Sequence, residues 1–287
     1  MAKYIPCVRG TNRNNVKQDP IAVQIILIGI ALLFFTLMLL IPLFLVFIKA
    51  FEQGAMVYFA AISEPMALEA IKLTFITMAI VVPINTIFGL VAAWSIAKFK
   101  FKGKSFLITI IDLPFAISPV VSGLIFVLLF STTHGIFAPL LNEWGISIIF
   151  TRAAIILVTL FGTLPFVARE IIPLMEAQGT TEEEAALTLG ASGFKTFCLI
   201  TFPNIKWALL YGVMLTAARA AGEFGAVSVV SGHIRGLTNT IPLHVEILYN
   251  EYQFSASFAV ATLLTGIAFI NIIIKNISDW KIKQQKI

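Results

Sequence analysis

Long apolar runs alternate with short polar segments along the whole chain. Each run is close to or above the ~20 residues that an α-helix needs to cross the hydrocarbon core of a bilayer. The runs cover residues 24–48, 71–97, 106–130, 151–175, 207–230 and 255–275. The pattern therefore predicts an all-α membrane protein with about six transmembrane helices.

The polar segments divide the chain into three parts. A polar N-terminal segment over residues 1–22 precedes a transmembrane domain over 23–276, and a Lys-rich tail occupies 277–287. The longer connections within the domain are expected at 49–68, 131–149 and 231–254.

Composition agrees with a protein that lies almost wholly in the lipid bilayer. The 287 residues are 59% hydrophobic and 12% charged, whereas soluble domains carry roughly twice that charged fraction. No separate soluble domain is expected. The net charge of +5 does not indicate nucleic-acid binding, because the basic residues lie beside the apolar runs rather than on one face.

The basic residues also predict an orientation. Cytoplasmic loops carry an excess of Lys and Arg. Most of the 20 Lys and Arg residues fall in alternate polar segments, namely 1–22, 98–104, 177–206 and 277–287. The opposite side holds only Lys49, Lys72, Arg152 and Arg235. Both termini and the segment 177–206 are therefore expected in the cytoplasm.

A long polar stretch, Glu182 to Lys206, lies between the fourth and fifth apolar runs. It opens with three acidic residues and continues with small residues and helix formers. Gly190 can adopt a positive φ at no steric cost, which favours a short helix, a turn and a second helix. We expect this stretch to stay outside the bilayer and to touch another protein.

The same stretch resembles the EAA signature of ABC-importer permeases. The resemblance is carried by Glu184-Ala185-Ala186, Gly190, Ile200 and Pro203. In that family this segment, here 177–206, is a coupling helix that docks on a cytoplasmic ATPase. The resemblance implies a type I ABC importer permease fold and these coupling residues: Glu184, Ala185, Ala186, Gly190 and Gly193. Phe202 departs from the family's usual Leu, and an ordinary cytoplasmic loop is the alternative.

The fifth run contains an unusual pair of charges, Arg219 and Glu223. A spacing of four residues places both on one face of a helix. Ionisable groups at this depth usually face a bundle interior or a pore. The pair is interpreted either as part of a translocation pathway or as an ion pair that fixes packing against a neighbouring subunit, with Gly222 and Gly225 allowing close approach. The two interpretations are compatible.

Proline-containing motifs interrupt the third and fourth runs, at Asp112–Pro119 and Leu164–Glu170. Such breaks free backbone groups that must then face protein or water. Kinks that serve packing are the favoured interpretation, and pore lining is the alternative. Asp112 itself is expected near the inner interface.

No pattern for catalysis, cofactor binding or metal binding stands out. Gly103-Lys104-Ser105 resembles the end of a phosphate-binding loop, but Lys98 stands where that motif needs a glycine. The chain is therefore not expected to hydrolyse ATP, and the lysines of 98–104 are interpreted as topological anchors.

Neither the histidines nor one glycine-containing loop predicts a binding site. His134, His233 and His244 have no metal-site spacing and are expected in outer loops. The loop 231–236 either cradles an anion with backbone N–H groups or is a flexible turn, and the turn is favoured.

Three longer stretches narrow the resemblance to the W-type permease subunits of sulfate/thiosulfate importers. They are Leu113–Leu124, Pro203–Gly212 and Gly222–Gly232, with Pro242–Leu248 in addition. The resemblance implies a heterodimeric pore with a T-type permease subunit, a dimer of ATP-binding subunits and a periplasmic sulfate-binding protein. A bacterial inner membrane is expected, and Ile, Lys, Asn and Phe usage leaves an algal plastid open. The alternatives are a molybdate/tungstate permease or a standalone secondary transporter.

Overall fold

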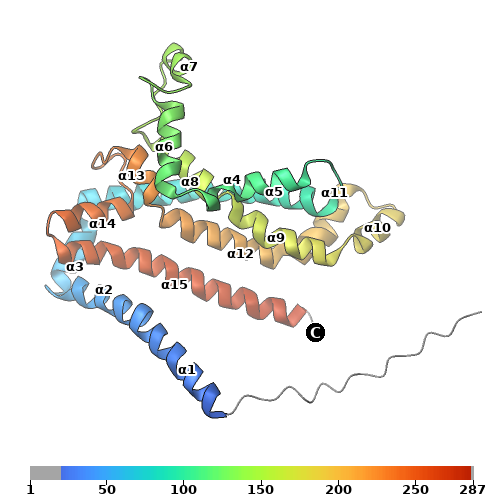
Figure 1. Cartoon of the computed structure of the whole chain (residues 1–287), viewed down its shortest axis with the longest axis horizontal. Coiled ribbons are helices and arrows are strands. Elements are labelled where there is room, and N and C mark those ends of the chain that lie inside the picture. Colours follow the sequence, from blue (N-terminus) through green and yellow to red (C-terminus); the bar gives the residue numbers. More distant parts are fainter. Residues whose placement is uncertain (1–20, 286–287) are drawn as a thin grey trace, which may run out of the picture. The chain divides into compact units, whose positions relative to one another are not determined.

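The computed structural model describes residues 21–285, and the side chains of 278–285 are left aside. The expected N-terminal segment 1–22 therefore lies almost entirely outside the described residues. By its contacts the chain divides into two units, Met1–Leu45 and Val46–Ile287. The described residues form helices joined by turns and irregular segments (Figure 1).

The first unit contains α1 (Ile21–Phe35), a π-helical turn η1 (Thr36–Leu40) and the start of α2 (Ile41–Phe51). At the turn, the Ile41 N–H donates to the Thr36 carbonyl. Pro42 follows directly and has no N–H to donate, which accounts for the local widening of the helix. None of the α1 side chains is buried, as expected for a helix that faces lipid.

The second unit holds the remaining helices. In chain order they are α3 (Ala55–Ser63), α4 (Pro65–Lys98), α5 (Lys104–Ala116), α6 (Pro119–Phe130), α7 (Ala138–Glu143), α8 (Arg152–Thr163), α9 (Pro165–Gln178), α10 (Thr181–Thr188), α11 (Gly193–Thr196), η2 (Phe197–Thr201), α12 (Phe202–Ala221), α13 (Gly225–Ser231), α14 (Ile241–Asn250) and α15 (Phe254–Gln285).

Five or six apolar helical runs, long enough to cross a membrane, account for most of these helices. Five helical runs in the described part are long and apolar enough to cross a bilayer, and the bent pair α5–α6 makes a sixth if counted as one span. The five runs are Ile21–Phe51, Pro65–Lys98, Arg152–Gln178, Gly193–Ala221 and Phe254–Ile277. The all-α architecture with about six spans is confirmed. The final helix continues to Gln285, so most of the expected tail 277–287 is helical.

The third crossing is sharply bent. Helices α5 and α6 meet at an angle of 108°. The bend lies at Ile117 and Ser118, whose extended backbone conformations precede Pro119 at the start of α6. A residue before proline is pushed away from the helical region. The proline motif predicts a break here, but not its size.

The fifth crossing differs from the predicted run 207–230. Its helix begins as early as Gly193 and ends at Ala221, and α13 starts only at Gly225. Apolarity continues across this gap, so a hydropathy pattern does not detect it. The Gly222 N–H still donates to the Ala218 carbonyl, and the helix ends there, three residues before α13 begins at Gly225.

The connection 231–254 is more than a loop. It contains α14, whose buried residues Ile241, Leu243, His244 and Leu248 pack it against α4 and α15. The connection 131–149 likewise contains the short helix α7.

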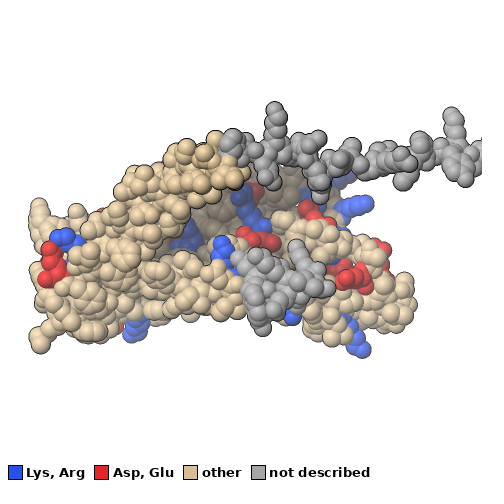
Figure 2. All heavy atoms as spheres, turned by 90° about the horizontal axis from the view of Figure 1, so that it is seen from below, with Lys and Arg blue, Asp and Glu red and all other residues tan. Residues whose placement is uncertain are grey.

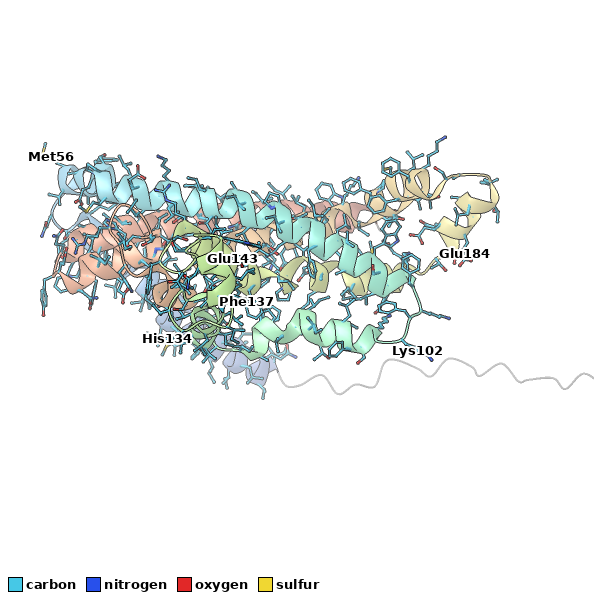
Figure 3. All side chains as sticks on the ribbon, turned by 90° about the horizontal axis from the view of Figure 1, so that it is seen from above. Met56, Lys102, His134, Phe137, Glu143 and Glu184 are labelled. Carbon is cyan, nitrogen blue, oxygen red and sulfur yellow. The ribbon has the colours of Figure 1, made fainter. Side chains whose placement is uncertain are left out.

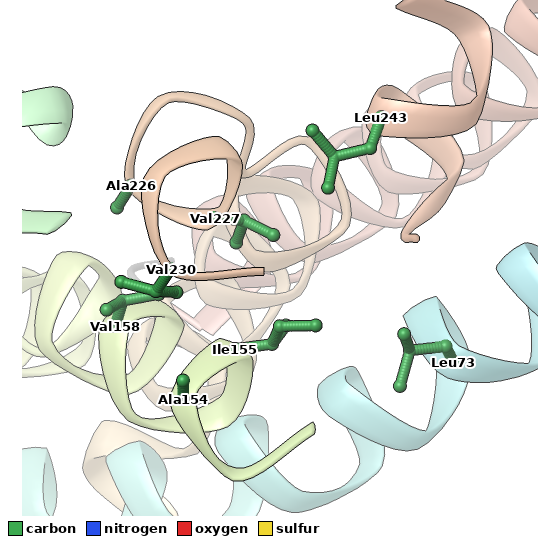
Figure 4. Packing of buried hydrophobic residues seen from close by; sticks show 8 residues of the cluster. All are labelled: Leu73, Ala154, Ile155, Val158, Ala226, Val227, Val230 and Leu243. Carbon is green, nitrogen blue, oxygen red and sulfur yellow. The ribbon is translucent and has the colours of Figure 1, made fainter. Parts of the chain in front are cut away.

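The core of the second unit has two main clusters. One joins α4, α8, α13 and α14 through Leu73, Ala154, Ile155, Val158, Ala226, Val227, Val230 and Leu243 (Figure 4). The other joins α4, α9 and α12 through Ala93, Val167, Ile171, Met175 and Ile205. Close helix approach depends on small residues here, since a Cβ on Gly89 would lie 2.6 Å from Cβ of Val167.

Many large apolar side chains stay exposed outside these clusters. Figure 2, which views the molecule from below relative to Figure 1, shows that most of this face carries no charge. Lys, Arg, Asp and Glu gather there in a few clusters. A soluble protein rarely leaves so large a contiguous apolar area uncovered. Contact with lipid tails explains it.

Candidate functional site

Helix α10 carries three of the predicted coupling residues, Glu184, Ala185 and Ala186, and lies at one end of the second unit. In Figure 3, Glu184 lies at the same end as Lys102 and far from Met56. The predicted helix, turn and second helix are observed. Gly190 takes φ +85° in the turn, and the chain then enters α11, which leads through η2 into α12.

The three acidic residues of α10 have different partners. Glu182 accepts a hydrogen bond from Asn204 Nδ2 at 2.7 Å, which ties α10 to α12. Glu183 pairs with Lys98 at 2.6 Å. Glu184 accepts a local bond, from the Thr180 hydroxyl at 2.6 Å. All three lie in the first turn, where negative charge favours the helix dipole.

The remaining coupling residues leave this end of the molecule open. Ala185 is exposed, and Ala186 is half-buried. A Cβ on Gly190 or Gly193 would meet nothing within 4 Å. Three large apolar side chains nearby are well exposed, namely Leu187, Leu189 and Phe194. An exposed apolar surface with small residues, next to the acidic first turn of α10, is suited to a protein partner.

The Arg219–Glu223 pair forms, although not as a helix-face pair. The helix ends at Ala221, and Glu223 lies in the break before α13. Arg219 Nη1 is 2.9 Å from Glu223 Oε2. The other carboxylate oxygen accepts from the Ala226 N–H at 3.3 Å, at the start of α13. The carboxylate side chain is 2% exposed and the guanidinium side chain 35%, so the cation is the more accessible member of the pair.

A second ion pair joins the two proline motifs. Arg169 Nε donates to Asp112 Oδ1 at 2.7 Å, linking α9 to α5, and its guanidinium lies 4.5 Å from the centre of the Phe115 ring. The two residues belong to separate proline motifs, Asp112–Pro119 and Leu164–Glu170, and their pairing is not predicted from the sequence. Opposite charges inside two neighbouring apolar runs were the available signal, because such charges need partners.

The histidines take up two kinds of position. His233 and His134 are exposed in irregular segments. His244 is predicted in an outer loop, and this is wrong. It lies in helix α14, where it is 4% exposed. Burial lowers the pKa of His244, and the nearby Glu64 partly opposes this effect. Within the described residues, no group of three or more His, Cys, Asp or Glu side chains is placed to hold a metal ion.

The loop 231–236 is a closed turn. The His233 N–H donates to Ser231 Oγ at 3.2 Å, and the Ile234 N–H donates to Thr238 Oγ1 at 3.1 Å. These N–H groups are satisfied within the loop, which favours the turn over the anion cradle.

Comparison with known proteins assigns the chain to a family. Residues 85–283 match the family described as binding-protein-dependent transport system inner membrane component. The chain belongs to this family. The sequence resemblance to ABC-importer permeases is thereby confirmed, and this is a family of permeases rather than of enzymes.

Several members of the family are close relatives. The chain is 46% identical over 260 residues to "Sulfate transport system permease protein CysW" of Escherichia coli (strain K12), covering 91% of this chain and 89% of the relative. It is 48% identical over 270 residues to the protein of the same name from Synechococcus elongatus, covering 94% of each. It is 32% identical over 243 residues to CysT of E. coli, covering 85% of this chain and 87% of that protein.

A solved structure shares the fold. A chain of a bacterial alginate ABC transporter, in complex with an alginate-bound periplasmic protein, superposes with a TM-score of 0.74 at 16% identity, covering 90% of this chain and 92% of that one. At this identity the likeness concerns the fold alone. The integral-membrane permease architecture is therefore supported by sequence and by structure.

Proposed function

We propose that this chain is a permease subunit of an ABC importer that moves sulfate and thiosulfate across the membrane. The observation that carries the proposal is 46–48% identity to sulfate transport permeases over about nine-tenths of the chain. The Arg219–Glu223 and Asp112–Arg169 ion pairs both lie within residues 85–283, the part of the chain that matches the permease family. The chemistry of the anion pathway is therefore expected to be the same as in the related sulfate transport permeases.

The proposal includes three kinds of partner. A separate ATP-binding subunit dimer docks on α10 and supplies the energy. A second, T-type permease completes the pore, consistent with the 32% identity between this chain and CysT, and a periplasmic sulfate-binding protein delivers the anion. Both termini and α10 then lie in the cytoplasm, in a bacterial inner membrane or an algal plastid membrane.

Arg219 provides an anion-binding group with limited strength. An oxyanion accepts charge-assisted hydrogen bonds from a guanidinium. Glu223, which holds Arg219 at 2.9 Å, reduces its net attraction. Transport needs a site that binds the anion strongly enough for it to enter and weakly enough for it to leave. A guanidinium that is already paired with a carboxylate meets both needs.

Competition uptake tests the substrate. We expect ATP-dependent uptake of labelled sulfate by the reconstituted complex, with strong inhibition by unlabelled thiosulfate and little inhibition by excess molybdate. Inhibition by molybdate at equal concentration would instead assign the chain to molybdate/tungstate import. Uptake that persists without any ATPase subunit would indicate a standalone secondary transporter.

A further inference from the structure

Helix α10 has no hydrophobic anchor. None of its side chains is buried, and a pocket of about 200 Å³ separates it from the end of α4, lined by Trp94, Lys98, Glu183 and Leu187 among others. A helix that moves as a rigid extension of its neighbours usually buries an apolar face against them. The connection of α10 to the membrane helices must therefore depend on polar contacts.

One of these contacts is nearly enclosed. Lys98, the last residue of α4, pairs with Glu183 at 2.6 Å, and their side chains are only 8% and 17% exposed. Lys98 also donates to the carbonyl of Gly179, which follows the end of α9. A single ammonium group thus joins α4, the end of α9 and α10.

The carboxylate side of the pair extends the connection. The other oxygen of Glu183 accepts from the Thr201 hydroxyl at 2.8 Å, and Thr201 is buried in η2. Nearby, the ring of Trp94 on α4 stacks on that of Phe197 on η2, with centroids 4.8 Å apart. Glu183 therefore lies between the two long helices that start or end here, α4 and α12.

We propose that the Lys98–Glu183 pair, with Thr201, is the link through which a displacement of α10 reaches α4 and α12, so that these are positioning residues for transport. The inference rests on the proposed function, in which an ATPase moves α10. It assigns different roles to adjacent acids: Glu184 stays available for the partner, whereas Glu183 holds α10 to the membrane helices. It also revises the sequence interpretation of Lys98 as a topological anchor.

The test compares Lys98→Met and Glu183→Gln with the charge exchange Lys98→Glu/Glu183→Lys, all in the assembled complex in proteoliposomes. The single variants should keep the ATPase subunit bound, while sulfate taken up per ATP hydrolysed falls about tenfold, the size of a typical coupling free energy between sites. The charge exchange should restore most of this ratio of sulfate to ATP.

Lys104→Met is the matched control. The Lys104–Glu176 pair, at 2.9 Å, has side chains that are 37% and 47% exposed, so its loss should leave the ratio of sulfate to ATP unchanged.

A second measurement does not depend on the substrate. Hydrogen exchange of the α10 amides in the same complex should quicken about tenfold in Lys98→Met, because local opening becomes easier when the link is cut. Thr201→Val, which removes one hydrogen bond and preserves shape, should produce a smaller change of the same sign and serves if the charge variants do not assemble. Wild-type exchange in both Lys98→Met and Thr201→Val, or a Lys104→Met effect of equal size, would overturn the link. If the wild-type complex itself took up no sulfate, that result would count against the proposed function alone.

Discussion

At the scale of single residues, two pairs of opposite charges lie within the apolar helical runs. Glu223 at 2% exposure has Arg219, and Asp112 has Arg169. An unpaired charge at this depth is costly, so each partner stabilises the other. What distinguishes Arg219 is its partial exposure beside a fully enclosed carboxylate, which leaves part of its hydrogen-bonding capacity free for a passing anion.

Substituting Arg219 separates transport from packing. Arg219→Ala should lower sulfate uptake by about tenfold or more, the value of one charge-assisted hydrogen bond, while the complex still assembles. The double variant Arg219→Ala/Glu223→Gln removes the uncompensated carboxylate and should recover any lost thermal stability without recovering uptake. Arg235→Ala is the control, because it breaks an ion pair between Arg235, which precedes α14, and Glu251, which follows it. Full recovery of uptake in the double variant would assign the pair to packing.

The sequence predicts one ion pair and misses the other for a simple reason. Arg219 and Glu223 are four residues apart, so their contact survives even though the helix ends between them. Asp112 and Arg169 are separated by 57 residues. Their contact depends on how α5 packs against α9, which a local pattern does not contain.

At the scale of the elements, hydropathy predicts where the chain crosses the membrane but not how each crossing is built. The 108° bend between α5 and α6 and the break before α13 both lie inside apolar runs. Proline and glycine signal these places without fixing an angle, because the angle is set by the packing of α6 against α13. The helix α14 was missed because its apolar residues are interleaved with polar ones.

The α6–α13 contact depends on Gly123. A Cβ there would lie 2.8 Å from the Ala226 carbonyl oxygen and 2.8 Å from Val229 Cβ. Gly123→Ala should therefore destabilise the protein by about 1–3 kcal/mol, as overpacking of a close contact does. Gly266→Ala is the matched control, since a Cβ at that position meets nothing within 4 Å. Thermal unfolding of the two variants in detergent measures the difference, and equal melting temperatures would show that α6 and α13 are not held this closely.

At the scale of the whole molecule, the second unit places the two proposed sites, α10 and the Arg219–Glu223 pair, apart. The α10 end carries exposed Leu189 and Phe194, two neighbouring acids tied inward and one acid, Glu184, without an inward partner. The Arg219–Glu223 pair lies where α12 gives way to α13. Helix α12 runs between these regions and is continuous through η2 and α11 with the turn at Gly190. Movement at one end therefore has a helical path to the other.

In the proposed function, energy enters this membrane protein through α10 from a separate ATPase. The most direct measurement is the amount of ATPase subunit that co-purifies with the permease, compared between wild type, Glu184→Lys and the distant control Glu52→Lys. Glu184→Lys should insert normally yet retain about tenfold less ATPase, the loss typical of a central interface residue, and the control should bind as wild type does. Wild-type amounts of bound ATPase on Glu184→Lys, together with undiminished sulfate uptake, would contradict the account.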